Sequence, residues 1–240
     1  MMKESIDDFV DRGFFEVLDN GFVRLVNALG GDHSVVSSAR VSYGDESKGE
    51  KADKGLINFL MKHDHGTPFE HIVFTFHIKC PIFVARQWFR HRIASYNEIS
   101  GRYVEMKDVF YHPTTFRANN KLDKQSSGEH EWETDDFLDM CDTYDDAIRD
   151  AYASYEKLLE YGLCREQARG ILPMAIYTEF YWTVNARSLF NFIKLRAAPN
   201  AQWEIQEYAN IINKIVSSIA PWTFEAFNKH VLGVENEDTS

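Results

Sequence analysis

The sequence has little cysteine and no cysteine motif that is typical of a disulfide framework or a redox site. Its three cysteines, Cys80, Cys141 and Cys164, are odd in number and form no C-x-x-C pair. A disulfide framework is therefore not expected, and a reduced compartment is favoured. Neither motif nor spacing gives any of the three an activating base, so a cysteine nucleophile has little support.

Long apolar stretches are also missing. No run approaches the roughly 20 apolar residues that are needed to span a bilayer. The first residues, MMKESIDDFVDRGFF, are acidic and lack the basic region followed by an apolar stretch that marks a secretory signal. We therefore expect a soluble, cytosolic protein.

Positive charge is in deficit, with 26 Lys and Arg against 37 Asp and Glu and a formal net charge of -11. Such a chain repels phosphate backbones at long range, which argues against a nucleic-acid-binding protein. An anionic ligand must therefore meet a local basic pocket.

Neither G-x-G-x-x-G nor G-x-x-x-x-G-K-[ST] occurs, so a dinucleotide is not expected on a Rossmann unit or a P-loop. His63-Asp64-His65 lacks further ligands at a recognisable spacing, and no metal site is predicted.

Apolar and aromatic residues are plentiful, at 44% and 14% of the chain. This content is enough for a buried core, and the aromatics fit either a thick core or subunit contacts and ring-stacking sites. The periodicity of the sequence predicts one α+β domain over 1–240, with a small, mainly antiparallel sheet packed against helices. The predicted elements are a hairpin or two short strands over 14–30, strands over 71–79 and 174–184, helices over 53–63, 81–92, 132–161, 186–196 and 202–219, and a surface loop over 119–128.

The most unusual segment is RQWFRHRIASYNEISGRY, residues 86–103, which concentrates arginines in an otherwise acidic chain. On a helix, Arg86 and Arg90 are four residues apart and share a face, whereas His91 and Arg92 point elsewhere. Two anions on different sides can be held in this way. The alternative is a helix C-terminus with cations that complement the helix dipole.

The order of these residues resembles the signature of the flavin-dependent thymidylate synthases. The matching pattern, R-H-R-x-x-S-x-N-E-x-S-x-R-Y, has nine fixed positions and covers 90–103. Further similarity lies in HGTPFEH at 65–71, REQAR at 165–169, WTVNARSLFNF at 182–192 and KLRA at 194–197. The resemblance covers most of 55–230.

The resemblance implies that FAD is held in extended form between the subunits of a homotetramer. The resemblance implies that His65 lies near the flavin and the folate. The chemistry fits, because a pyrophosphate needs Arg and His donors and the flavin ring needs hydrogen-bonding partners. The positions that match cofactor-binding residues are His65, Thr67, Arg90, His91, Arg92, Glu98, Asn185, Arg187 and Asn191.

The resemblance also implies a substrate, dUMP, and a reaction. NADPH reduces FAD, 5,10-methylenetetrahydrofolate supplies the methylene group, and the products are dTMP, tetrahydrofolate and NADP. Arg196 matches the arginine that activates the pyrimidine and is the expected catalytic residue. Without the resemblance, Arg196 is a cation in the last turn of a helix, and Asn185 is a helix cap. The matching substrate-binding positions are Gln87, Arg90, Ser100, Gly101, Arg102, Arg169 and Arg196.

Two other functions stay open at this point. A cysteine-dependent folate methyltransferase would need a reactive thiol, for which Cys164 is the plausible candidate because of Arg165 and Arg169. A non-enzymatic nucleotide- or RNA-binding module would use the arginine cluster together with exposed aromatic rings. Its candidate rings are Trp88, Phe89, Tyr96 and Tyr103.

Overall fold

The centre of the molecule is a five-stranded antiparallel sheet in the order β1-β2-β3-β7-β4. The computed structural model describes residues 13–44, 47–120, 127–128 and 130–234. The hairpin predicted over 14–30 is confirmed as β1 and β2, and both predicted longer strands are confirmed as β3 and β7. The sheet strands are β1 (Phe15–Val17), β2 (Gly21–Leu29), β3 (Val73–Pro81), β4 (Ser95–Glu98) and β7 (Tyr177–Asn185).

Helices account for most of the remaining structure, which confirms the α+β class. Four of the predicted helices, α3, α5, α7 and α8, lie close to their expected bounds. The helices are α2 (Asp32–Arg40), α3 (Glu50–Lys62), α4 (Ile82–Trp88), α5 (Thr134–Glu160), α6 (Arg165–Ala168), α7 (Ala186–Arg196), α8 (Trp203–Ile219) and α9 (Pro221–Phe227). Single turns form η1 (Val41–Tyr43), η2 (Thr67–His71), η3 (Arg169–Ile171) and η4 (Asn228–Leu232).

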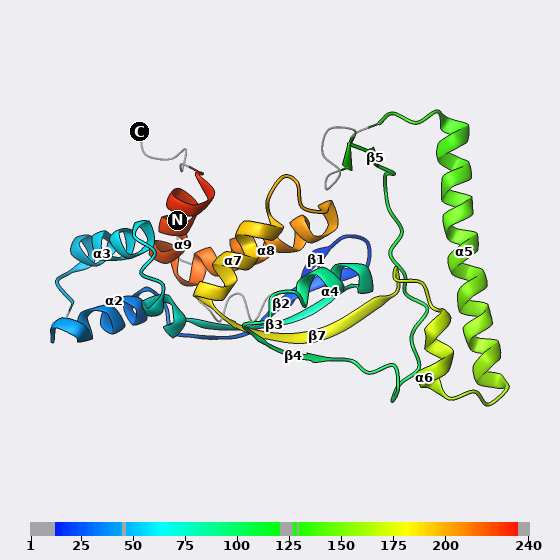
Figure 1. The fold of residues 1–240 in the computed structure, drawn as a ribbon, viewed down its shortest axis with the longest axis horizontal. Coiled ribbons are helices and arrows are strands. Elements are labelled where there is room, and N and C mark those ends of the chain that lie inside the picture. Colours follow the sequence, from blue (N-terminus) through cyan, green and yellow to red (C-terminus); the bar gives the residue numbers. More distant parts are fainter. Residues whose placement is uncertain (1–12, 45–46, 121–126, 129, 235–240) are drawn as a thin grey trace.

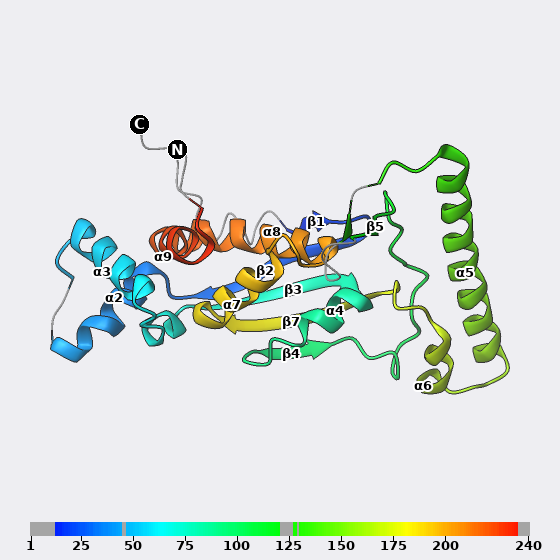
Figure 2. The same ribbon diagram turned by 45° about the horizontal axis from the view of Figure 1, so that its top comes forward.

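The main core lies between the sheet and the helices α7, α8 and α9, which Figure 2 shows on one side of the strands. Because side chains alternate across a strand, every second residue of β3 and β7 points into this core. Leu25, Phe76 and Trp182 are paired across three neighbouring strands, and each is at most 1% exposed. The opposite face stays partly accessible, with Tyr181 42% exposed.

The long helix predicted over 132–161 is confirmed as α5, whose 27 residues span about 40 Å. It stands at the right edge of Figure 1, with α6 beside its C-terminal part. Only Ile148 and Tyr155 of this helix are buried. Ile148 joins Phe110 and Ile176 in a second, smaller core. Most of the surface of α5 is therefore exposed in the single chain.

The helix predicted over 81–92 ends at Trp88, four residues early. Trp88 is fully buried against Phe180 and Trp182, and the chain turns after it. Tyr96 donates a hydrogen bond to the carbonyl oxygen of His91 at 2.7 Å and thereby closes the turn. The polar residues that follow form the edge strand β4, which pairs with β7. Because that pairing partner lies 80 residues or more along the chain, a local pattern does not reveal it.

This early end changes the geometry of the basic segment. Arg90 lies beyond α4 and does not share a helical face with Arg86, so that prediction was wrong. The loop predicted over 119–128 contains a two-stranded pairing of β5 (Ala118–Asn119) with β6 (Ser127–Gly128), and 121–126 lie outside the described residues. Within the described part of the chain, no helix is long and apolar enough to cross a membrane.

Candidate active site

A first cavity of about 520 Å³ lies beside the N-terminus of α7, and we name it the α7 cavity. Strand β7 ends at Asn185, whose side chain accepts the Ser188 backbone N–H at 2.9 Å and so begins the helix. Arg187 and Asn191, four residues apart, then share a face of α7. The turn after α4 supplies the facing side. The lining residues are Glu70, Arg90, His91, Arg92, Ile93, Ala94, Trp182, Val184, Asn185, Arg187, Ser188 and Asn191.

The α7 cavity brings together six of the nine predicted cofactor-binding residues, namely Arg90, His91, Arg92, Asn185, Arg187 and Asn191. The predicted helix cap at Asn185 is confirmed as well. A helix N-terminus adds its own attraction for anions. The donor set therefore fits an anionic ligand that also presents hydrogen-bonding groups.

A second cavity of about 270 Å³ lies beside α4, and we name it the α4 cavity. It contains Gly101 and Arg169 from the predicted substrate group. It also contains Glu98, which the resemblance gives to the cofactor and which accepts a hydrogen bond from Thr178 Oγ1 at 2.7 Å. The lining residues are Ile82, Ala85, Arg86, Phe89, Glu98, Ile99, Gly101, Met106, Arg169, Leu172, Ile176 and Thr178.

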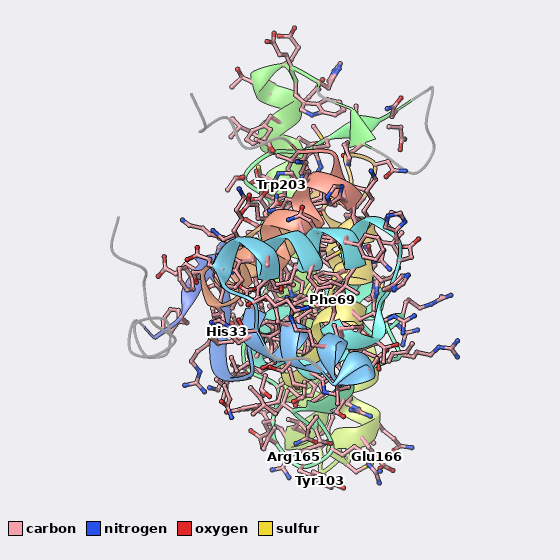
Figure 3. All side chains as sticks on the ribbon, turned by 90° about the vertical axis from the view of Figure 1, so that its left-hand side faces the viewer. His33, Phe69, Tyr103, Arg165, Glu166 and Trp203 are labelled. Atoms are coloured by element: carbon pink, nitrogen blue, oxygen red, sulfur yellow. The ribbon has the colours of Figure 1, made fainter. Side chains whose placement is uncertain are left out.

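Close packing explains why residue 101, in the wall of the α4 cavity, is a glycine. A Cβ atom at Gly101 would lie 2.9 Å from Met106 Sδ and 3.1 Å from Arg169 Cδ. Ser100 Oγ accepts the backbone N–H of Arg102 at 3.3 Å, and the Arg102 side chain pairs with Glu166 at 3.0 Å. Figure 3 shows Tyr103, Arg165 and Glu166 together at one end of the molecule, where this loop meets α6. Arg102 therefore lies at the edge of the molecule and does not line the α4 cavity.

His65 and Thr67 lie in a third, open hollow beside η2, and among the described residues Arg187 is the one other predicted site residue that lines it. As predicted, His65 lies in a loop, whereas Thr67 begins the single turn η2. Arg187 lines both this hollow and the α7 cavity, and its Nη1 atom pairs with Glu70 Oε1 at 2.5 Å. Gly66 packs directly under Arg187, since a Cβ atom there would lie 2.8 Å from Arg187 Cζ.

Arg196 is the last residue of α7, as predicted, and is held by two partners. Its Nε atom donates to His91 Nε2 at 3.0 Å, and its Nη2 atom donates to the carbonyl oxygen of Gln87 at 3.1 Å. Burial and the charge of Arg196 lower the pKa of His91 to about 4. His91 is therefore neutral at pH 7 and, because a guanidinium only donates, carries its proton on Nδ1.

Arg102 and Arg187 pair with carboxylates, but five other arginines of the site lack acidic partners. Among the described residues, none of these side chains lies within ion-pair distance of a carboxylate. In a chain with 37 acidic residues, such unpaired cations point to anionic ligands from outside. The arginines concerned are Arg86, Arg90, Arg92, Arg169 and Arg196.

The cysteines lie apart from these groups. None of the three lines the α7 cavity, the α4 cavity or the hollow beside η2. Cys80 is fully buried, and burial raises the pKa of its thiol. Cys164 is exposed and its thiol lies 3.5 Å from Gln167 Oε1. The geometry therefore gives no support to a cysteine nucleophile.

The aromatic rings proposed for RNA binding are mostly unavailable. Trp88 is fully buried, and Phe89 and Tyr96 pack on Phe180 in the core. Only Tyr103 of the four is largely exposed, at 76%. These four rings therefore do not form a common exposed surface on which bases could stack.

Some lining residues were not singled out in the sequence. Glu70 and Ser188 lie within quoted motifs, HGTPFEH and WTVNARSLFNF, so their neighbours already pointed to them. Trp182 begins the second of these motifs, whereas Met106 carries no local signal. These two reach the cavities through the packing of the sheet and of the 100–106 loop.

The chain is similar to known proteins over most of its length. Residues 24–222 match the Thy1 family, described as thymidylate synthase complementing protein. A flavin-dependent thymidylate synthase of Thermosipho melanesiensis is 58% identical over 90% of this chain and 93% of its own length. An enzyme of the same description from Thermus thermophilus is 50% identical over 90% of this chain and 78% of its own.

A solved structure shares the fold. The UMP/dUMP methylase PolB from Streptomyces cacaoi, bound with 5-Br dUMP, superposes with a TM-score of 0.81 and 35% identity, covering 90% of this chain and 98% of that one. The extent of the family match and the identity to these relatives leave one conclusion. The chain belongs to the family of flavin-dependent thymidylate synthases.

Proposed function

We propose that this chain converts dUMP to dTMP by reductive methylation, with FAD as cofactor and with 5,10-methylenetetrahydrofolate and NADPH as co-substrates. The observation that carries the proposal is the set of arginines without acidic partners, of which Arg90 and Arg92 line the α7 cavity and Arg86 and Arg169 line the α4 cavity. The family relationship supplies the reaction. The cavities supply donors for two different anions, a dinucleotide and a nucleotide monophosphate.

The α7 cavity fits FAD by the chemistry of its donors. Arg90, Arg92 and the N-terminus of α7 suit a pyrophosphate, and Asn185 and Asn191 offer amide groups to ring nitrogens and oxygens. We assign FAD to these residues together with His91, Arg187, His65, Thr67 and Glu98. Once bound, FAD supplies the electrons that convert the transferred methylene group to a methyl group.

Arg196 acts on the pyrimidine in this proposal. Its guanidinium donates to the N3–O2 edge of the uracil ring and stabilises the negative charge that develops there. Gln87 and the neutral His91 accept hydrogen bonds from the same guanidinium and hold it in place. The phosphate of dUMP is assigned to Ser100, Gly101, Arg102 and Arg169, with Arg90 between the two ligands.

We further propose that four copies assemble and that each FAD lies between subunits. The assigned FAD residues fall into separate hollows of a single chain, with Glu98 in the α4 cavity and His65 beside η2. Residues from different copies can combine into one extended site. The exposed surface of α5 and the accessible face of the sheet offer area for such contacts. Light scattering should give about four times 27.9 kDa, whereas a fully active monomer would contradict shared sites.

The thiol-independent reaction is the direct test of the proposed function. Replacing Cys80, Cys141 and Cys164 together by alanine should leave the formation of dTMP measurable, because no thiol lines a cavity. Some loss of stability is expected from the buried Cys80. The assay follows dTMP from dUMP, methylenetetrahydrofolate, NADPH and FAD. A folded variant that binds FAD but makes no dTMP would favour the cysteine-dependent mechanism.

Arg102→Ala should chiefly raise the KM for dUMP. A phosphate contact is equally strong in the ground and transition states, so its loss weakens binding without slowing the chemical step. We expect an increase of about tenfold, corresponding to about 1.4 kcal/mol, since Arg102 is exposed. Steady-state kinetics with varied dUMP measures the effect. Glu166→Gln is the matched control, because it removes only the exposed ion pair and should change KM little. A fall in kcat at unchanged KM would contradict this role.

A further inference from the structure

A chain of hydrogen bonds leads from Arg196 away from the cavities to a buried carboxylate at the start of α8. Arg196 Nη1 approaches Gln87 Oε1 at 3.5 Å, which is a long contact that adds to the bond with the Gln87 carbonyl oxygen. Gln87 Nε2 donates to Gln202 Oε1. Gln202 Nε2 in turn donates to Glu204 Oε2 at 2.9 Å.

The two ends of this chain fix its direction. A guanidinium is only a donor, so Gln87 must present its amide oxygen to Arg196. A carboxylate is only an acceptor, so Gln202 must present its amide NH₂ group to Glu204. Each glutamine then has a single orientation that satisfies both neighbours. A rotated amide at either position would set oxygen against oxygen or NH₂ against NH₂.

The far end of the chain is firmly held. Glu204 is 3% exposed, and its Oε1 atom accepts from Arg117 Nη2 at 2.5 Å and from the Tyr111 hydroxyl at 3.1 Å. The Arg117 guanidinium also lies over the ring of Trp203, 5.2 Å from its centroid. A buried charge with donors from separate segments has one stable position. It is therefore a fixed reference for the two amides.

We propose that Glu204 and Gln202 are positioning residues that hold the amide of Gln87, and through it the guanidinium of Arg196, in the orientation needed for the reaction. The proposal rests on the role assigned to Arg196 in the proposed function. In this proposal, Gln202 does more than join α8 to α4, because it also orients the amide of Gln87. Removing the link should misplace Arg196 without removing a single atom that contacts a ligand.

The test compares Gln202→Leu, which is close in size but has no amide, with Tyr111→Phe. Tyr111→Phe removes a donor from the other oxygen of the same carboxylate and leaves the bond of Gln202 to Glu204 intact. The single-turnover rate of dTMP formation in Gln202→Leu should fall by about 10-fold to 100-fold, with little change in the affinity for dUMP. Tyr111→Phe should keep the wild-type rate, even if both variants lose similar stability, because Arg117 still holds the same carboxylate oxygen of Glu204.

Two further readouts separate positioning from stability. In an Arg196→Lys background, Gln202→Leu should have almost no added effect, because its effect passes through the guanidinium. In Gln202→Leu alone, the pKa of His91 measured by NMR should rise in part, because burial, the larger cause of its low value, remains while the charge of Arg196 moves away. Additive rate effects, or an unchanged pKa of His91, would overturn the inference and leave the proposed function intact. A wild-type protein that makes no dTMP would overturn both.

Discussion

Arg196→Lys is expected to lower the single-turnover rate of dTMP formation by a factor of about 10² to 10³, the usual loss when one donor to a developing negative charge is removed. Lysine keeps the charge but not the planar fork that reaches His91 and Gln87 together. The variant should therefore fail mainly in the chemical step. Rapid-quench measurements on reduced enzyme with saturating dUMP and methylenetetrahydrofolate record the rate directly.

The competing explanation for Arg196 is a cation that complements the dipole at the end of α7. Lys194 supplies the matched control, because it lies in the same last turn and is exposed. Lys194→Ala should cost a little stability and leave the rate unchanged. If Arg196→Lys behaved in the same way, with a wild-type rate and weaker binding of dUMP, Arg196 would be a binding residue and would not activate the ring.

Arg92→Ala is expected to weaken the binding of FAD by about 100-fold. Arg92 lines the α7 cavity and has no carboxylate partner among the described residues, so its charge is free for a pyrophosphate. Arg92 can donate two charge-assisted hydrogen bonds to the pyrophosphate, each worth about 1.5–3 kcal/mol. Water replaces part of this interaction in the variant, which leaves a loss of the expected size. Calorimetry with FAD, or the flavin absorbance that remains after gel filtration, measures the effect.

The control for charge alone is Arg149→Ala. Arg149 lies on α5, is exposed and pairs with Asp146 three residues earlier. Its removal changes the net charge by the same amount and should leave the dissociation constant for FAD unchanged. Equal weakening in both variants would show a general electrostatic effect, and the assignment of Arg92 to the pyrophosphate would be wrong.

The sequence was informative wherever the signal was local. The β-branched and aromatic residues of β3, the apolar run of β7 and the helical spacing in α5, α7 and α8 predicted these elements closely. The cap at Asn185 was also readable, since a side chain bonds a backbone group three residues away. Predictions from such patterns need no knowledge of the fold.

Features that depend on distant partners were missed. Strand β4 is polar and short, and only its pairing with β7 makes it a strand. Helix α9 begins where Asp32 accepts the backbone N–H groups of Trp222 and Thr223, a cap from 190 residues away. The network of Gln87, Gln202 and Glu204 likewise joins residues that are far apart in the sequence. The family resemblance identified Arg196 together with His91 and Gln87, but not Gln202 and Glu204, which lie outside the quoted motifs.

With Arg187 assigned to FAD, Gly66 is a position where a substitution should lower activity and hardly affect folding. Its φ of -76° and ψ of -29° suit any amino acid, so the backbone does not require glycine. In that conformation, alanine would even restrict the unfolded chain and add about 0.4–1 kcal/mol of stability. The added methyl group would displace the side chain of Arg187, whose Cζ and Cδ atoms lie 2.8 and 2.9 Å from the new Cβ position, and no backbone atom is among its three nearest contacts. A mutational survey scored by thermal stability would therefore rate Gly66→Ala as harmless, whereas a survey scored by growth without thymidine would reject it.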